Sequence, residues 1–472
     1  MTTTNKPNPN KPATIRQLRS SGYHVLGVKE EMRKNLVSKI RAGEELFPGV
    51  VGYEDTVIPQ IENAILSGQD MVLLGERGQA KTRIARSLIN LLDEETPAIA
   101  GCEVNDDPFA PICKACQLRI SEEGDDTPIH WLPREARYGE KLATPDITIA
   151  DLVGEVDPIR VAEGRYLSDE LTIHYGLIPR THRGIFCINE LPDLAERIQV
   201  GLLNIMEERD VQIRGYKVRL PLDVFVVVSA NPEDYTNRGR IITPLKDRIG
   251  SQIRTHYPRT LEHEILIMEA ESIPFHAEGI ETIFPQYMSE VIAQITRQAR
   301  QSTDVSQRSG VSVRVSITNY ENVMSNAVRR AIRLKERQAA PRVSDLSAVI
   351  ASTTGKIELD TIGDLREEKV VERLVKQAIT QVFRTYFDIG EFDQLVAGFE
   401  RGLSVHASDS QSAMEYVNQL GSVGGLKAAV AKLSGHGSPA TVASAVEFIL
   451  EGLHLNKRLN KVEVDGLVDY RR

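Results

Sequence analysis

The sequence predicts an α/β protein: a parallel sheet with helices on both faces, followed by a lid and an extension that are both helical. Three short apolar runs have the length of buried strands and alternate with patterns of helical periodicity, which is typical of a parallel sheet. These runs are Asp70–Leu74, Gly184–Ile188 and Val224–Ser229. A glycine-rich loop links the first run to the helical pattern behind it. Beyond Pro258 the β-branched apolar runs stop, and the patterns that follow are helical.

Helical patterns lie around and between these strands. One covers Glu30–Ala42, and Gly43 after it is the residue type that most often ends a helix. Others cover Ile84–Leu92 and Leu194–Glu208. Beyond Pro258 we expect helices over Leu261–Ala270, Tyr287–Ala299, Thr318–Lys335, Val343–Ser352, Glu367–Phe387 and Ala440–Leu455.

We expect four segments from these patterns. Residues 1–14 are polar and rich in Pro and Asn, which predicts a disordered tail. Residues 15–257 would form an N-terminal helix and the α/β core, 258–355 a helical lid, and 356–472 a helical extension.

The composition excludes several classes of protein. The 472 residues are 41% hydrophobic, so the chain is neither disordered, collagen-like nor a coiled coil. With 57 Lys and Arg against 66 Asp and Glu, the net charge of −9 argues against broad nucleic-acid binding. Four cysteines are too few for a disulfide scaffold. Since no apolar stretch approaches the roughly 20 residues of a spanning helix and no signal peptide is visible, we expect a cytoplasmic protein that does not enter the membrane.

The loop after the first strand has the chemistry of a phosphate-binding loop. Two glycines allow backbone N–H groups to face one anion, a lysine neutralises the β- and γ-phosphates, and a threonine hydroxyl reaches Mg²⁺. The residues are Gly75, Glu76, Arg77, Gly78, Gln79, Ala80, Lys81 and Thr82. Ala80 occupies a position where the common motif has glycine. This loop predicts a nucleotide site.

Two later strands end in polar residues that such a site needs. The second strand ends in Asn189-Glu190, where the usual pair is Asp-Glu. Glu190 is placed to act as the general base or to orient water, whereas Asn189 brings an amide oxygen without negative charge, so metal affinity should fall and hydrolysis should be slow. The third strand ends at Asn231, which can position the water between Glu190 and the γ-phosphate.

These residues resemble the AAA+ ATPases of the magnesium-chelatase I-subunit and MoxR group, over about residues 45 to 355. Besides the phosphate loop with its Ala-Lys-Thr form, the resemblance rests on Phe47–Gly52 and His174–Gly184. It implies that Val51 and Gly52 line the adenine pocket. It also implies that residues 157–180 form the helix-2 insertion of this group, and that the alternating segment 211–220 forms the hairpin before sensor 1.

The resemblance assigns further roles. It implies that Asn231 is sensor 1, that Arg248 is an arginine finger acting on a neighbouring subunit, and that Arg314 is sensor 2. Members of the group bind ATP and Mg²⁺, form homo-oligomeric rings, usually hexamers, and often act on a partner with a von Willebrand A domain. A protein-remodelling or assembly ATPase is therefore the first functional expectation.

Departures from the family pattern keep alternatives open. Asn189 replaces an Asp, Tyr53 replaces a usual Gln, and the helical extension exceeds a minimal chelatase I subunit. A nucleotide-binding scaffold with little hydrolysis is the second hypothesis. A magnesium-chelatase subunit and a DNA-acting machine are further ones, the latter favoured only by the basic residues of the hairpin, Arg214, Lys217 and Arg219.

Three of the four cysteines lie in one predicted insertion, residues 101–130. Cys102 precedes the Cys-x-x-Cys of Cys113 and Cys116, which is a plausible three-thiolate zinc set that His130 would complete. Free thiols or a redox pair are the alternatives. Cys187 lies inside the second strand and is expected to be a core residue.

Overall fold

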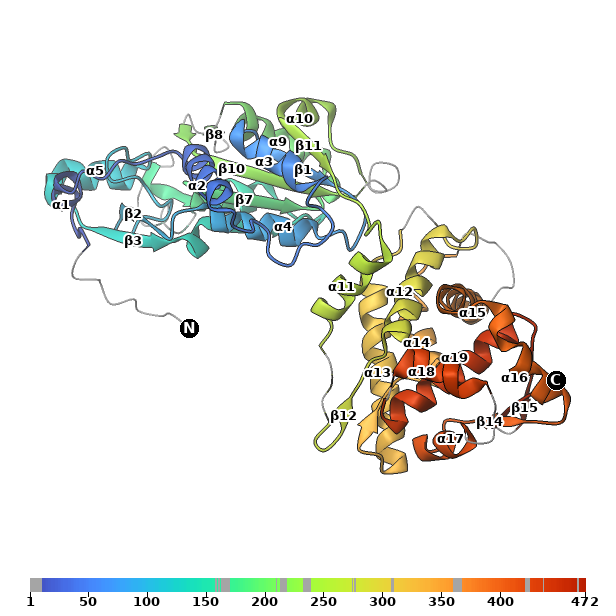
Figure 1. Ribbon diagram of the computed structural model, residues 1–472. Coiled ribbons are helices and arrows are strands. Elements are labelled where there is room, and N and C mark those ends of the chain that lie inside the picture. The colour runs from blue at the N-terminus through green and yellow to red at the C-terminus, as the bar shows by residue number, and fades with distance from the viewer. Residues whose placement is uncertain are drawn as a thin grey trace. The chain divides into compact units, whose positions relative to one another are not determined.

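The computed structural model describes residues 11–157, 159, 162, 170–208, 210–212, 219–231, 239–273, 275, 277–306, 310–359, 367–420, 425–435, 437–464 and 467–472. The chain divides into two compact units (Figure 1). The first comprises residues 1–76 and 80–256, and the second comprises 77–79 and 257–472.

A five-stranded parallel sheet forms the centre of the first unit. Its order is β11-β1-β10-β7-β4, and every neighbouring pair is parallel. The strands are β1 (Met71–Leu74), β4 (Tyr138–Leu142), β7 (Gly184–Asn189), β10 (Val224–Ala230) and β11 (Ser251–Arg254). The three inner strands are the apolar runs that the sequence predicts. Because the strands are parallel, their carboxyl ends lie at one edge of the sheet, where the phosphate loop begins.

Helices cover both faces of this sheet, as predicted. In β10, Phe225 and Val227 pack into one hydrophobic cluster, whereas Val224, Val226 and Val228 pack into another. Successive side chains of a strand point to opposite faces, so this alternation shows that β10 is buried on both faces. The first cluster includes side chains of α2 (Val28–Ala42), α3 (Ile58–Leu66) and α4 (Lys81–Ser87). The second includes side chains of α8 (Leu177–Arg180), α9 (Glu196–Glu207) and α10 (Thr243–Arg248).

Three antiparallel pairs are added to this core: β2 (Glu95–Ile99) with β3 (Ile129–Pro133), β5 (Gly154–Val156) with β6 (Ile173–Tyr175), and β8 (Asp210–Gln212) with β9 (Arg219–Pro221). Elsewhere in this unit, the described residues form α1 (Ile15–Ser20), α5 (Lys114–Glu123) and α6 (Ile149–Leu152). Short 3-10 turns cover Leu88–Leu91, Gly124–Asp126, Arg134–Arg137, Glu170–Thr172 and Leu191–Asp193. The tip of the predicted hairpin, residues 213–218, and residues 158, 160, 161 and 163–169 of the predicted insertion lie outside the described residues.

The predicted N-terminal tail is too long. The indole Nε1 of Trp131 donates a hydrogen bond of 3.0 Å to the carbonyl of Pro12, and the amide of Ile129 donates one of 2.9 Å to that of Ala13. Thr14 caps α1 with its side chain. These contacts order residues 12–14, which composition alone could not show. Residues 1–10 lie outside the described part of the chain.

The second unit is mainly helical. Its helices are α11 (Leu261–Glu271), α12 (Gln286–Gln301), α13 (Arg314–Leu334), α14 (Val349–Thr353), α15 (Glu367–Tyr386), α16 (Asp393–Glu400), α17 (Ala413–Leu420), α18 (Leu426–Ser434) and α19 (Pro439–Leu455), with 3-10 turns at Val343–Ala348 and Ile389–Phe392. Short strands that the sequence patterns do not reveal are added to the predicted helices. They are β12 (Glu281–Thr282) with β13 (Gln338–Ala339), and the order β14-β16-β15 from β14 (Val405–Ala407), β15 (Asn460–Val464) and β16 (Leu467–Arg471).

One hydrophobic core joins the expected lid and extension. It contains side chains from α11 to β16, and α19 is buried along nearly its whole length, as expected of a helix that is apolar on all sides. The two buried carboxylates of α19 are satisfied: Glu447 accepts hydrogen bonds from the Tyr416 hydroxyl and the Ser344 amide, and Glu451 accepts from Lys461. The division of this region into two domains stays a prediction. Within the described part of the chain, no helix is both long and apolar enough to cross a membrane.

Candidate functional site

The phosphate loop leaves β1 and enters α4 through left-handed backbone. Gly78 has φ 78° and Ala80 has φ 55°. A non-glycine residue in this region costs about 1 kcal/mol or more, which is the physical reason why glycine is common at the position of Ala80. After this turn, Lys81 is the first residue of α4.

The ammonium group of Lys81 is buried and held by oxygen atoms. It donates to the carbonyl of Gly75, to the carbonyl of Glu76 at 2.9 Å, and to Oδ1 of Asn231 at 2.6 Å. Asn231 follows β10 directly, so the contact joins the ends of two neighbouring strands.

The same asparagine contacts the predicted base. Nδ2 of Asn231 donates a hydrogen bond of 2.7 Å to Oε2 of Glu190, which follows β7 with φ 57°. Lys81, Asn231 and Glu190 therefore form one hydrogen-bonded chain across the ends of β1, β10 and β7. The sequence predicts these three residues for one site, and the structure brings them together.

Asn189 has both sides of its amide engaged. Its Nδ2 donates to Oε1 of Glu140 at 2.7 Å, and its Oδ1 accepts from the hydroxyl of Ser229 at 3.1 Å. The carboxylate of Glu140 can only accept, which assigns the amide nitrogen to that side. The amide oxygen that we expected to hold a metal-bound water is therefore directed to Ser229.

Glu140 is a polar residue of the site that the sequence does not reveal. Arg86 of α4 donates to both of its carboxylate oxygens, at 2.8 and 3.0 Å, and this arginine holds the pKa of Glu140 below its usual range. Glu140 lies on β4, which pairs with β7. The polar sequence Tyr138–Leu142 lacks the apolar run that marks the inner strands, so no signal pointed to it.

The other predicted site residues come from the loop of Val51 and Gly52, from α10 and from α13. Arg248, at the end of α10, donates to Oε2 of Glu207 at 2.6 Å and to the carbonyl of Pro244 at 2.8 Å. Gly52 has φ 81°, and its amide donates to Glu54. Arg314 is exposed at the start of α13 in the second unit. The roles of Arg248, Arg314, Val51 and Gly52 stay predictions.

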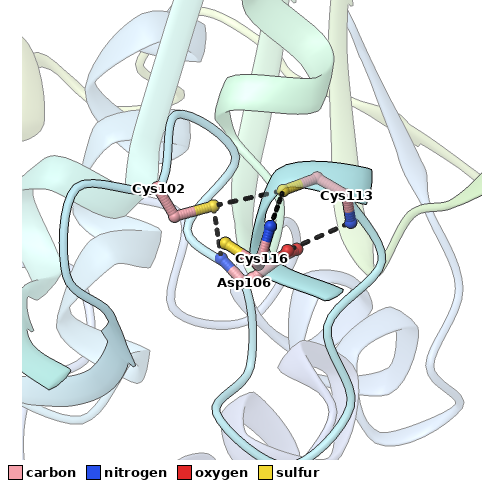
Figure 2. Close-up of side chains that lie close together, drawn as sticks. All are labelled: Cys102, Asp106, Cys113 and Cys116. Atoms are coloured by element: carbon pink, nitrogen blue, oxygen red, sulfur yellow. Dashed lines mark hydrogen bonds between the residues drawn. The ribbon is translucent and has the colours of Figure 1, made fainter. Parts of the chain in front are cut away.

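The three cysteines of the insertion gather at the start of α5 (Figure 2). Sγ of Cys102 lies 3.9 Å from Sγ of Cys113. Ligand atoms of Cys102, Asp106, Cys113 and Cys116 all lie within 4.8 Å of one another. Hydrogen bonds from Cys113 and Cys116 hold the pKa of the Cys102 thiol well below its usual range. His130, our expected fourth member, lies on β3 and does not belong to this group; Asp106 occupies that place. Cys187 is buried in β7, as predicted.

Comparison with known proteins supports the resemblance. The chain is 25% identical over 235 residues to the chloroplast magnesium-chelatase subunit ChlI-2 of Arabidopsis thaliana, covering 47% of this chain and 51% of the relative. It is 23% identical over 325 residues to the magnesium-chelatase subunit ChlI of Nephroselmis olivacea, covering 64% and 86%. This chain is similar to magnesium-chelatase I subunits. These matches confirm the resemblance that the motifs indicate.

The matches to the magnesium-chelatase subunits cover only part of several relatives. The chain spans about half the length of several of the relatives that it matches. No family model matches the chain. A solved assembly of the magnesium-chelatase subunits BchI and BchD is 19% identical, with a TM-score of 0.35, and covers 71% of this chain and 95% of the other. A likeness at that score adds nothing to the assignment.

Proposed function

We propose that this chain is an ATPase of the AAA+ class that binds ATP with Mg²⁺, hydrolyses it, and uses the energy to remodel or assemble a partner protein. The hydrogen-bonded chain of Lys81, Asn231 and Glu190 carries this proposal. Through Asn231 it connects the ammonium group of Lys81, which would bind the phosphates, to the carboxylate of Glu190, which would activate the attacking water. A loop that served only as a structural turn would need none of these contacts.

Each of the three residues has a definable role. Lys81 is held by carbonyl and amide oxygens, and the phosphate oxygens of ATP would replace some of them. Glu190 accepts the proton of the water that attacks the γ-phosphorus, while the bond to the ADP oxygen breaks. Asn231 fixes the Glu190 carboxylate by donating to it, which keeps the base in line with the phosphate.

The donor set near Asn189 fits a weakly held magnesium ion. When bound with ATP, Mg²⁺ neutralises charge on the β- and γ-phosphates. Thr82 would offer its hydroxyl. Asn189 adds no charge, and the carboxylate of Glu140 beside it is balanced by Arg86. The nucleotide therefore has to supply most of the negative charge for the metal.

The second candidate function is a nucleotide-dependent scaffold without significant hydrolysis. The observation in its favour is the missing strand-end carboxylate at Asn189. The two functions differ in turnover and not in nucleotide binding, so they can be separated by one pair of assays.

The test measures ATP binding and phosphate release on the full chain. Glu190→Gln should keep ATP binding and lose hydrolysis, because the amide retains shape but cannot accept the proton. Lys81→Ala should lose binding. Glu30→Gln, an exposed residue of α2, is the matched control and should retain both. If wild type and Glu190→Gln release phosphate at the same rate, the scaffold is the correct function.

The partner and assembly belong to the same proposal. We expect a homo-oligomeric ring in which Arg248 acts as an arginine finger on the nucleotide site of the neighbouring subunit. Arg314 is proposed as sensor 2. A von Willebrand A domain protein is the expected partner. A role in tetrapyrrole metallation, suggested only by the names of the relatives, would require metal insertion by the chain with its partner subunits. A DNA-acting role would require salt-dependent DNA binding. A cytoplasmic location belongs to the same proposal, because four cysteines are too few for the disulfide scaffold of a secreted protein.

A further inference from the structure

We infer that Cys102, Asp106, Cys113 and Cys116 form a structural Zn²⁺ site in which the carboxylate of Asp106 is the fourth ligand. This site is separate from the nucleotide site and independent of the proposed ATPase function. It is formed by the segment that follows β2 and by the first turn of α5, which the ATPase mechanism does not use (Figure 2).

The backbone builds the group from residues close in sequence. Gly101 and Asn105 have φ of 76° and 56°, and these left-handed residues turn the chain so that Cys102 and Asp106 approach one another. Cys113 is the N-cap of α5, and Cys116 lies in its first turn. In a tetrahedral site with Zn–S bonds of about 2.3 Å, two sulfurs lie about 3.8 Å apart. The distance of 3.9 Å between Cys102 and Cys113 agrees with this spacing.

The carboxylate of Asp106 indicates a bound cation independently of the cysteine sulfurs. Its side chain is fully buried, and its Oδ2 accepts from the amide of Cys113 at 3.0 Å. Its Oδ1 is buried without a hydrogen-bond partner in the described part of the chain. A buried carboxylate oxygen without a partner is costly. A cation bound between Asp106 and the three sulfurs satisfies this oxygen.

The surroundings of the sulfurs are those of thiolate ligands. The amides of Val104 and Asp106 each donate to Sγ of Cys102 at 3.4 Å. The amide of Cys116 donates to Sγ of Cys113 at 3.4 Å. Such N–H···S hydrogen bonds orient thiolates and stabilise their charge. A cavity of about 200 Å³ opens beside the three cysteines and gives a path for metal entry.

The donor set selects the metal and its role. Three soft thiolates favour Zn²⁺ over Mg²⁺ or Ca²⁺, and a carboxylate is an accepted fourth zinc ligand. Four protein ligands leave no open position, so the site is structural. A disulfide between Cys102 and Cys113 would use two thiols but would leave Asp106 unsatisfied. Among the described residues, the fully buried part of the local hydrophobic cluster is small. It contains Ile99 and Val104 besides Cys113 and Cys116, and Ile112, Ile120 and Tyr175 pack against it while only partly buried. This segment therefore has little apolar core of its own and gains from a metal.

The test determines zinc content by mass spectrometry of the full-length protein purified under reducing conditions, and then Co²⁺ binding by absorption. We expect one zinc per chain, and a thiolate-to-cobalt charge-transfer band with tetrahedral d–d bands. Asp106→Ala should weaken metal binding at least tenfold and change the cobalt d–d spectrum. Cys116→Ser should also lose affinity. Cys187→Ala, which alters a buried cysteine elsewhere, and His130→Ala should both retain zinc.

Two results would overturn the inference. One is a protein that binds neither Zn²⁺ nor Co²⁺ while its cysteines are reduced. The other is a loss of metal with His130→Ala that equals the loss with Asp106→Ala, because the histidine would then be the ligand. Far-UV circular dichroism of Asp106→Asn, which keeps the volume of the side chain, separates loss of metal from loss of fold.

Discussion

At the scale of single residues, the hydrogen bond between Asn189 and Glu140 explains why an amide occupies a position where a carboxylate is usual. The two side chains are 2.7 Å apart, and Glu140 needs a donor there. An aspartate at position 189 would place two carboxylates in contact, which raises the pKa of one of them and removes its charge. Asn189 and Glu140 together supply one amide and one carboxylate. The negative charge lies on Glu140 of β4, and not at the end of β7 where the usual aspartate would carry it.

Exchanging the two groups should restore the usual arrangement. We expect Asn189→Asp alone to lower stability without improving Mg²⁺ affinity. The double variant Asn189→Asp with Glu140→Gln should recover stability and lower the Mg²⁺ concentration needed for half-maximal ATPase rate. The measurement is a double-mutant cycle of unfolding midpoints and Mg²⁺ titrations. Additive effects of the two substitutions would contradict the coupling.

His182 predicts a pH dependence of stability in the first unit. Burial, and then the charge of Arg183, lowers the pKa of His182 to about 3, and its Nδ1 accepts from the amide of Asp223. In the unfolded chain a histidine has a pKa of about 6.5. Between these values the unfolded state binds a proton that the folded state does not, so stability falls as pH falls below about 6.5. The loss reaches roughly 2 kcal/mol at pH 5.

The pH prediction can be measured through Trp131, the sole tryptophan, which lies in this unit. Urea unfolding followed by its fluorescence at pH 7, 6 and 5 should show a shallower pH dependence for His182→Gln than for wild type. Burial is the main cause that raises the pKa of Asp223, so protonation of this carboxylate favours the folded state as pH falls. Both wild type and His182→Gln contain Asp223, so the difference between their slopes reports on His182. Equal slopes would show that His182 is not held neutral.

At the scale of elements, the sequence predicts the inner strands and misses the outer ones for one reason. β1, β7 and β10 are buried on both faces and therefore read as continuous apolar runs. β4 and β11 are edge strands, with sequences Tyr138–Leu142 and Ser251–Arg254 that include exposed or half-buried polar residues. Glu140 was missed with its strand. Asp106 was missed because cysteine spacing shows which thiols can meet but not which loop oxygen turns toward them.

Removing the proposed zinc should loosen one element and leave the nucleotide site intact. After chelation, trypsin should cut after Lys114 and Arg119, both in α5, because the segment around the cysteines has little apolar core. ATP binding, measured after Mg²⁺ is restored, should persist. Peptide mapping by mass spectrometry gives the cleavage sites, and protection should return when Zn²⁺ is added back. An unchanged digestion pattern would mean that no metal orders this segment.

At the scale of the whole molecule, the parallel α/β core and the mainly helical second part follow from hydrophobic periodicity, and the structure confirms both. The small antiparallel sheet of β14, β15 and β16 could not be predicted, because strands of three to five residues carry too little pattern. Subunit arrangement is a property of more than one chain, so a single chain shows only candidate interface residues such as Arg248.

A ring in which Arg248 acts on the neighbouring subunit predicts complementation. Arg248→Ala and Lys81→Ala should each abolish turnover. A mixture of the two should regain part of it, because some interfaces then combine an intact Lys81 with an intact Arg248. The control is a mixture of Lys81→Ala with Asn231→Ala, in which every site carries a lesion of its own and no activity should return. No recovery in the first mixture would assign Arg248 to its ion pair with Glu207 instead.

The most direct test of the ATPase is steady-state phosphate release at saturating ATP and Mg²⁺ by wild type and by Glu190→Gln. A general base contributes on the order of 100-fold or more, so the variant should be slower by at least about that factor. Glu30→Gln should match wild type. Equal rates for wild type and Glu190→Gln would contradict the account. The hydrogen-bonded residues Lys81, Asn231 and Glu190 would then bind a nucleotide without hydrolysing it.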